Sequence, residues 1–206
     1  MATEQAVFIV DDDEDVRTSL AWLFESAGVA AQTFATAKDF LASPPCPGCL
    51  VLDLRMPGMD GAALFERLRA ERRTLPVIFL SAHGDISTAV HLVQQGAFDF
   101  VEKPFAQGEI LAKVKKALSR NQLSMAEERE RAKLHKRFAG LTSREREVLY
   151  RVTRGQANKV IAIELGIAEK TVEIHRSHVM HKMGARTLAE LIGITNRLQK
   201  GKGNPL

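Results

Sequence analysis

The sequence has little cysteine and no long uncharged apolar segment. Its two cysteines, Cys46 and Cys49, stand in the loop before a predicted strand, and no second pair completes the four ligands that structural zinc needs. We interpret both as reduced structural thiols, with a disulfide-forming sensor as the alternative. No segment is apolar enough to span a bilayer and no signal-peptide pattern occurs at the amino terminus, so we expect a cytoplasmic protein without a membrane partner.

An excess of positive charge is confined to one half of the chain. The formal net charge is +4, yet residues 1–120 carry 12 Lys and Arg against 16 Asp and Glu, and residues 121–206 carry 17 against 9. A basic small domain joined to an acidic one predicts nucleic acid as the partner of the basic domain.

Polar side chains stand at the ends of four predicted strands. They are Asp11 and Asp12 after residues 6–10, Asp53 at the end of residues 50–53, Ser81 after residues 76–80, and Lys103 after residues 98–102. In an open parallel sheet the carboxyl ends of the strands form the edge where ligands bind. We therefore expect these five side chains to lie together.

Three neighbouring carboxylates repel one another unless a hard cation joins them, and Mg²⁺ prefers oxygen ligands. Asp53 is then placed to attack a phosphoryl group while Lys103 and Ser81 neutralise the phosphoryl oxygens. A calcium loop is the alternative for the acids after residue 10. It is excluded because Val16 stands at its sixth position and Trp22 at its twelfth, where Gly and Glu are needed.

Strands and helices alternate five times in the first half of the chain, with residues 29–34 as the second strand. This alternation predicts an α/β fold, a flavodoxin-like doubly wound parallel sheet of five strands in the order 2-1-3-4-5. Between Gly108 and Gly140 no Gly or Pro interrupts the chain, and a helical apolar stripe fades after Met125. We expect a semi-rigid helical linker there, with a flexible tether as the alternative.

The last part of the chain has the pattern of a small all-α domain. Thr142 or Ser143 is placed to cap a helix, a second helix covers residues 158–165 and ends at Gly166, and a third covers residues 169–183. A helix, a short turn and a second helix form a helix-turn-helix, whose second helix enters the major groove of DNA.

Helical spacing sorts residues 169–183 into two faces. The predicted core face holds Val172, Val179 and Met183, and the predicted base-reading face holds Glu173, Ile174 and Ser177. The candidate phosphate contacts are Lys159, Lys170, Thr171, Arg176 and Lys182. Ordinary solvated surface is the alternative for each of them. His175, His178 and His181 diverge by about 120° around the helix, which argues against a shared metal.

The first 105 residues resemble the receiver domain of bacterial response regulators. The resemblance rests on Asp11-Asp12, on Asp53 with Met56-Pro57-Gly58, on Ser81-Ala82 and on Lys103-Pro104-Phe105. It implies that Asp53 is the phosphoacceptor and that Asp11 or Asp12, Asp53 and the backbone carbonyl of Arg55 hold Mg²⁺. It also implies that Ser81 and Phe100 form a switch pair and that Lys103 contacts the phosphoryl group ahead of a cis Pro104.

About 60 residues of the second half resemble the helix-turn-helix of the NarL/FixJ family, also called LuxR-type. The matching motifs are Leu141-Thr142-Ser143-Arg144-Glu145, Asn158-Lys159-Val160-Ile161-Ala162, Thr171-Val172-Glu173-Ile174 and Lys182-Met183. With His83-Gly84-Asp85 in the first domain, the whole chain looks most like the FixJ, StyR and TodT group. Glu173 departs from the family, in which Lys often stands at that position.

The resemblance implies a receiver over residues 1–118, a linker over 119–139 and a DNA-binding domain over 140–206. The expected function is that of a transcription regulator: a sensor histidine kinase phosphorylates Asp53, a face carrying Val90 and Val93 forms a homodimer, and the dimer binds promoter DNA and RNA polymerase. Two other functions were weighed. A phosphatase of the haloacid-dehalogenase type would need a second Asp where Arg55 stands, so we expect no enzyme. A constitutive DNA-binding protein would not need the complete set of site residues.

Overall fold

The computed structural model describes residues 5–82 and 86–199. Its contacts divide the chain into two compact units, residues 1–125 and residues 126–206. The sequence motif His83-Gly84-Asp85 lies outside the described residues.

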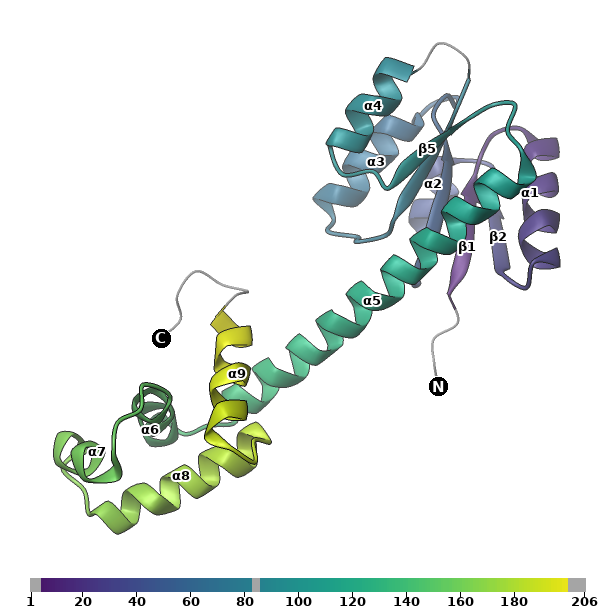
Figure 1. Cartoon of the computed structure of the whole chain (residues 1–206). Coiled ribbons are helices and arrows are strands. Elements are labelled where there is room, and N and C mark those ends of the chain that lie inside the picture. The colour runs from purple at the N-terminus through teal and green to yellow at the C-terminus, as the bar shows by residue number, and fades with distance from the viewer. Residues whose placement is uncertain (1–4, 83–85, 200–206) are drawn as a thin grey trace. The chain divides into compact units, whose positions relative to one another are not determined.

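The first unit is a parallel sheet flanked by helices (Figure 1). Its strands are β1 (Ala6–Val10), β2 (Ala30–Phe34), β3 (Gly48–Asp53), β4 (Val77–Ser81) and β5 (Asp99–Glu102). Its helices are α1 (Glu14–Ser26), α2 (Ala37–Ala42), α3 (Gly61–Ala70), α4 (Ile86–Gln94) and the first part of α5 (Gln107–Ala139). The strand order is β2-β1-β3-β4-β5 and every pair is parallel, which confirms the predicted fold.

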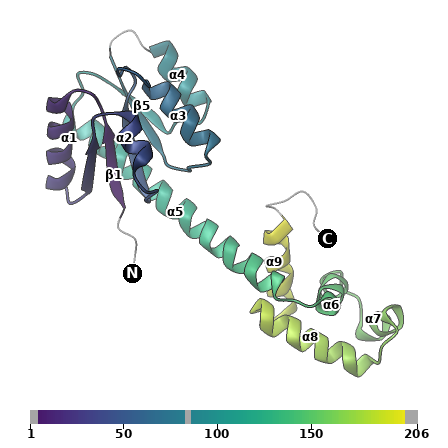
Figure 2. The same ribbon diagram turned by 180° about the vertical axis from the view of Figure 1, so that it is seen from behind.

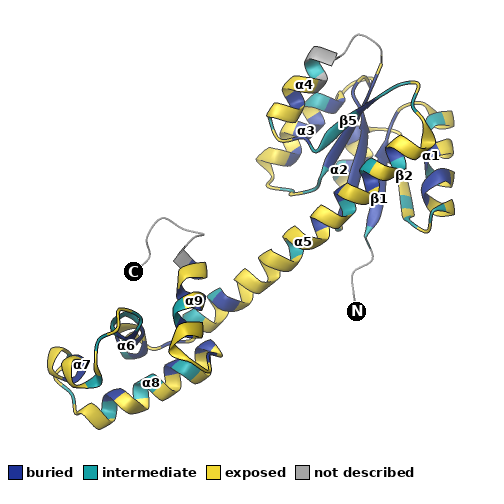
Figure 3. Cartoon of the chain, viewed as in Figure 1, coloured by how far each residue is buried: buried dark blue, intermediate teal, exposed yellow. Residues whose placement is uncertain are grey.

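Helices cover both faces of this sheet (Figure 2). One core packs α1 and the start of α5 against the sheet, through Phe24 and Ile110 among others. The other core packs α2, α3 and α4 against the opposite face, through Phe40 and Leu64 among others. The central strand β3 is therefore buried along its whole length (Figure 3), as its continuous apolar sequence requires.

Strand β3 begins at Gly48, two residues before the predicted start. A Cβ atom at Gly48 would lie 1.9 Å from the carbonyl oxygen of Ala6, so only glycine allows β1 to approach this closely. As a correction to the prediction, Cys49 lies inside the strand and not in the preceding loop. Cys49 is buried, Cys46 is exposed, and both thiols are free. Burial raises the pKa of the Cys49 thiol, which favours the unreactive protonated form.

Asn121 of α5 joins three segments at the amino edge of the sheet. Its Oδ1 accepts hydrogen bonds from the Gly48 amide at 3.2 Å and from Gln5 Nε2 at 3.1 Å. Its Nδ2 donates to the carbonyl oxygen of Thr74 at 3.4 Å. The buried Asn121 side chain thus satisfies backbone groups at the edge opposite to the strand ends that carry the acids.

The second unit is wholly helical. It contains the last part of α5, then α6 (Ser143–Thr153), α7 (Asn158–Leu165), α8 (Glu169–Met183) and α9 (Leu188–Gln199). The bounds of α7 and α8 agree with the predicted ones. Thr142 caps α6 in a capping box with Glu145. Helix α9 is not among the predicted helices, and its buried residues Leu191, Ile194 and Leu198 complete the core of this unit.

Candidate functional site

The ends of four parallel strands bring the predicted acidic site together at one edge of the first unit. Asp11 directly follows β1, Asp53 ends β3, Ser81 ends β4 and Lys103 directly follows β5. Asp11 is 1% exposed and Asp53 is 6% exposed. Lys103 Nζ lies 2.8 Å from Asp11 Oδ2 and 2.6 Å from Asp53 Oδ1. One ammonium group therefore bridges two buried carboxylates that are 42 positions apart in the sequence.

The backbone around Asp53 is fixed by its neighbours. The amide of Arg55 donates a hydrogen bond to Asp53 Oδ2 at 2.9 Å, and the amide of Gly61 donates to the carbonyl oxygen of Leu54 at 3.1 Å. A Cβ atom at Gly61 would lie 2.3 Å from the carbonyl oxygen of Asp53, so glycine is required where α3 begins. This close approach keeps the Arg55 backbone beside the Asp53 carboxylate.

Burial dominates the electrostatics of Asp53. It raises the pKa of Asp53, and the hydrogen bond and charge of Lys103 offset only part of that effect. For Lys103, burial alone would lower the pKa, but its hydrogen bonds to Asp11 and Asp53 outweigh burial and raise the pKa. Lys103 is therefore cationic at neutral pH, and the Asp53 carboxylate stays incompletely stabilised.

The carboxylates of Asp11, Asp12 and Asp53 form a group that fits a metal ion. Their candidate ligand oxygens all lie within 4.8 Å of one another. Asp12 is exposed, while Asp11 and Asp53 are buried, so the group opens to solvent on one side. A single Lys103 does not balance three carboxylates, and a set made only of carboxylate oxygens suits a hard divalent cation.

Ser81 and Phe100, the predicted switch pair, differ in their surroundings. Ser81 is 1% exposed, and its Oγ has no hydrogen-bond partner among the residues that the structure describes. Phe100 is half-buried. Lys113 Nζ lies 5.7 Å from the centre of the Phe100 ring and donates to the Phe100 carbonyl oxygen at 2.7 Å. Lys113 is not among the predicted site residues, although its i, i+4 spacing from Glu109 indicates an ion pair on this helix.

The backbone that follows Lys103 agrees with the expectation from the resemblance. The Lys103–Pro104 peptide bond is cis.

The second unit presents a helix-turn-helix. Residues 166–168 connect α7 to α8, and Gly166 takes a left-handed conformation with φ of 64°. Val172, Val179 and Met183 of α8 are buried, as predicted for the core face. On the opposite face Glu173 and Ser177 are exposed, and Ile174 is 49% exposed. An apolar side chain is thus held in solvent between two polar ones.

Several of the candidate phosphate contacts have partners within the unit. Lys170 pairs with Glu173 at 2.7 Å, and Arg176 Nη1 donates to Asn158 Oδ1 at 2.7 Å. The pair with Glu173 raises the pKa of Lys170. Lys159 is exposed and Thr171 is half-buried. Lys159 thus lies open to solvent on α7.

Lys182 contacts a buried carboxylate instead of extending freely into solvent. Its Nζ lies 2.7 Å from Glu145 Oε2. The Thr142 amide donates to the same oxygen at 2.8 Å, and His178 Nδ1 lies 3.7 Å from Oε1. Glu145 is 3% exposed. The sequence predicted a helix cap at Thr142 or Ser143, but not the contact of Glu145 with Lys182 of α8, because 37 positions separate the two partners.

The histidines of α8 gather no metal site. Among the residues that the structure describes, Asp11, Asp12 and Asp53 are the one group whose ligand atoms lie close enough together to hold a metal ion. His178 and His181 are exposed and His175 is half-buried.

Two family models match the chain. Residues 7–115 match the response regulator receiver domain, and residues 139–195 match the luxR family of bacterial regulatory proteins. The transcriptional regulatory protein FixJ of Azorhizobium caulinodans is 44% identical over 90% of this chain and 89% of its own length. The C4-dicarboxylate transport transcriptional regulatory protein DctR of Rhodobacter capsulatus is 46% identical over 92% of this chain and 98% of its own length. Both relatives are named as transcriptional regulatory proteins.

Solved structures agree with these matches. A structure of the response regulator StyR is 42% identical, covers 94% of this chain and 99% of that one, and has a TM-score of 0.89. Full-length FixJ from B. japonicum is 34% identical over 97% of this chain and 99% of that one, with a TM-score of 0.58. No helix among residues 5–82 and 86–199 has the length and apolar character that crossing a membrane demands. The chain belongs to the NarL/FixJ-type response regulators, transcription regulators that join a receiver domain to a LuxR-type helix-turn-helix.

Proposed function

We propose that Asp53 accepts a phosphoryl group from a sensor histidine kinase, and that this modification promotes dimerisation and promoter binding through α8. The observation that carries the proposal is the contact of Lys103 Nζ with both Asp11 and Asp53, at 2.8 and 2.6 Å, beside the exposed Asp12. These groups combine a buried carboxylate nucleophile, a cation and a place for a metal at one sheet edge.

In the proposed reaction an Asp53 carboxylate oxygen attacks phosphorus and forms a P–O bond. The P–N bond of phosphohistidine breaks, and its electron pair stays on the imidazole of the kinase. Lys103 turns a hydrogen bond from a carboxylate to a phosphoryl oxygen as the negative charge moves there. Mg²⁺, held by Asp11, Asp12, Asp53 and the Arg55 carbonyl oxygen, would supply further positive charge for the phosphoryl oxygens.

Ser81 is placed to couple phosphorylation of Asp53 to a conformational change in the rest of the receiver. Its buried Oγ has no hydrogen-bond partner among the described residues, so donation to a phosphoryl oxygen would satisfy it. Phe100, half-buried on the neighbouring strand β5, then turns inward. The surface of α4 and β5, where Val90 is 43% and Val93 is 37% exposed, becomes the dimer interface.

We further propose that α8 enters the major groove. Glu173, Ile174 and Ser177 face the bases, and Lys159, Lys170, Thr171, Arg176 and Lys182 face phosphates. Lys182 would keep its contact with Glu145 while its remaining hydrogens reach the backbone of the DNA. RNA polymerase is the expected partner at the promoter, the expected location is the cytoplasm, and the expected division of the chain is 1–118, 119–139 and 140–206.

Asp53→Asn tests the phosphoryl transfer. The protein is incubated with Mg²⁺ and phosphoramidate, which carries the P–N bond of phosphohistidine, and intact mass is measured. We expect one added phosphoryl group on the wild type and none on Asp53→Asn. Asp39→Asn removes an exposed carboxylate from α2 as a matched control and should be modified like the wild type. Phosphorylation of Asp53→Asn at the wild-type rate would contradict the proposal.

Selection of bound duplexes from a random library tests the output. It is run with and without Mg²⁺ and beryllofluoride, which mimics the phosphoryl group. We expect a two-fold symmetric site to be enriched only with the mimic, and Ile174→Ala to lose preference at one base pair of each half-site. Equal enrichment with and without the mimic would show that DNA binding does not depend on phosphorylation of Asp53.

A further inference from the structure

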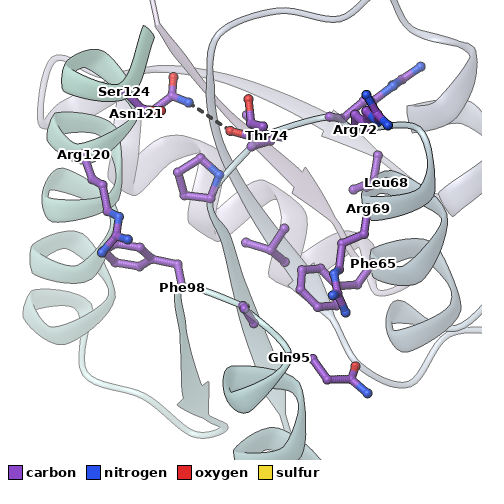
Figure 4. A pocket seen from close by; sticks show the side chains of 16 residues that line it. Phe65, Leu68, Arg69, Arg72, Thr74, Gln95, Phe98, Arg120, Asn121 and Ser124 are labelled. Carbon is purple, nitrogen blue, oxygen red and sulfur yellow. Dashed lines mark hydrogen bonds between the residues drawn. The ribbon is translucent and has the colours of Figure 1, made fainter. Parts of the chain in front are cut away.

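The first unit has a pocket at the amino edge of its sheet. Its volume is about 680 Å³, and it is lined by the end of α3, the segment 71–77, the connection from α4 to β5 and the α5 residues 120–124 (Figure 4). Val77, the first residue of β4, lines it, whereas Ser81 at the other end of the same strand belongs to the Asp53 site. The pocket shares no residue with the phosphorylation site.

The pocket concentrates the positive charge of an acidic domain. Four arginines line it: Arg69, Arg72, Arg73 and Arg120. No Asp or Glu is among the described residues that line it. Since residues 1–120 hold only 12 Lys and Arg against 16 Asp and Glu, a third of their cations surround this one pocket. The site therefore favours an anion.

Three of these guanidinium groups have no carboxylate partner among the described residues, and Arg69 Cζ lies 5.7 Å from the centre of the Phe65 ring. Arg73 pairs with Glu71 at 3.2 Å. None of the ion pairs between described residues involves Arg69, Arg72 or Arg120. Guanidinium groups bind carboxylates, sulfonates and phosphates with two hydrogen bonds at once, and they are weakly hydrated enough to do so at a partly covered site.

Arg72 holds a backbone conformation that arginine rarely adopts. Its φ is 56°, and it is the only residue other than glycine with positive φ in the described part of the chain. Glycine fills the comparable place at the ends of α1, α7 and α8, as Gly28, Gly166 and Gly184. An arginine where glycine would be unstrained indicates that the side chain itself is needed at the rim of the pocket.

The inner wall of the pocket is apolar. Phe65, Leu68, Val77 and Ala97 are buried, and Phe98 is half-buried beside them. Figure 4 shows Phe65, Leu68 and Arg69 on the α3 side, with Arg120, Asn121 and Ser124 on the α5 side. A bare inorganic anion would leave the exposed part of the Phe98 ring uncovered. An aromatic body with an anionic group satisfies both parts of the wall.

We propose that this pocket is a binding site for an aromatic organic anion, with Arg69, Arg72 and Arg120 supplying the positive charge around it and with its ring against Phe98. The volume is within the range of pockets that enclose small organic ligands. The ligand would contact the connection between α4 and β5 from the side opposite to Asp53. Binding itself does not depend on phosphorylation of Asp53.

The test uses the full-length chain and 8-anilinonaphthalene-1-sulfonate, an aromatic sulfonate whose fluorescence increases in apolar sites. We expect one saturable site on the wild type. Arg69→Gln combined with Arg120→Gln should weaken binding by about tenfold or more, because two charged hydrogen-bond donors are lost. Arg67→Gln combined with Lys116→Gln removes two charges from the same helices outside the pocket and should bind like the wild type. Equal loss in both double variants would overturn the proposal.

Arg72→Gly separates binding from stability. Glycine relieves the backbone strain and removes the guanidinium group, so the melting temperature should be equal or higher while the affinity falls several-fold. A variant that is as stable as the wild type and binds the probe with unchanged affinity would overturn the role of Arg72.

Competition by sodium phosphate at constant ionic strength tests whether the pocket prefers an aromatic anion to a bare one. We expect it to compete with the probe only at concentrations far above the dissociation constant of the probe. Displacement at equal concentrations would show a site for bare anions, and it would overturn the proposal of an aromatic ligand.

Discussion

Two lysines of this protein contact carboxylates at nearly the same distance, yet their surroundings differ. In the receiver, Lys103 lies 2.8 Å from Asp11 and 2.6 Å from Asp53. In the helical unit, Lys182 lies 2.7 Å from Glu145. Asp11 and Asp53 share Lys103 and have the Asp12 carboxylate beside them, whereas Glu145 has Lys182 and the Thr142 amide to itself. The first site has unbalanced negative charge and is open to a metal and a phosphoryl group, and the second is satisfied and structural.

The pKa shifts of Asp53 and Glu145 reflect this difference in surroundings. Burial raises the pKa of Asp53, and Lys103 compensates only in part. Burial also acts on Glu145, but the hydrogen bonds of Lys182 and Thr142 outweigh it and lower the pKa of Glu145. The balance between carboxylates and donors, and not the length of one ion pair, separates a reactive site from a stabilising one.

Lys103→Met should have the largest effect on the reactive site. The phosphoryl oxygens lose their nearest protein cation, so the rate of phosphoryl transfer should fall by about 10²-fold or more. The rate is measured with phosphoramidate and Mg²⁺. Lys115→Met, an exposed lysine of α5, is the control and should react normally. An unchanged rate in Lys103→Met would contradict the proposed role of Lys103 in phosphoryl transfer.

Lys182→Met should instead act on stability. It leaves the buried Glu145 carboxylate without its ammonium partner, so the helical unit should lose about 3 kcal/mol of unfolding free energy. Hydrogen exchange of α6 and α8 peptides in the full-length chain measures the loss where it occurs. Lys170→Met breaks only an exposed pair and should leave the exchange protection of α6 and α8 nearly unchanged.

Glu145→Gln should change the pH dependence of the helical unit. Because the folded pKa of Glu145 is lowered, its stabilisation is complete above the ordinary pKa of about 4.3 and is lost as the pH falls through the folded pKa. Exchange protection of α6 and α8 should therefore fall less on acidification in Glu145→Gln than in the wild type. The variant should also cost about 2 kcal/mol at pH 7. If the wild type and Glu145→Gln lost the same exchange protection on acidification, the acid sensitivity would belong to another titratable side chain.

Asp53→Asn should have the smallest effect on stability and the opposite sign. The raised pKa of Asp53 means that its contribution favours folding at low pH and is lost as the pH rises above the ordinary value of about 3.9. A neutral Asn removes this cost, so the receiver should gain about 1 kcal/mol at pH 7. Urea unfolding followed by hydrogen exchange of β3 and β4 peptides measures it. A destabilised Asp53→Asn receiver would mean that the contact with Lys103 outweighs burial.

Local patterns were enough to predict most of the architecture. Alternating strands and helices predicted the parallel sheet and the order of its strands. A parallel strand that is buried on both faces, such as β3, has a continuous apolar sequence and is therefore easy to recognise. Gly166 and Gly184 stand at the carboxyl ends of α7 and α8, whose amino-terminal cap positions hold alanines without a side-chain cap. Strand ends also placed Asp11, Asp53 and Lys103 on one edge, because parallel strands end on the same side. α9 was not predicted, and the start of β3 was placed two residues too late.

The sequence by itself thus determined which chemical groups meet at the carboxyl edge and which helix of the second unit carries Ile174 into solvent. Only the tertiary structure decided how Lys182 is used, how Asn121 joins the amino edge, and that four arginines surround one pocket. The physical reason is separation along the chain. A strand end or a helix face follows from neighbouring residues, whereas the partner of a side chain 37 or more positions away depends on how whole elements pack.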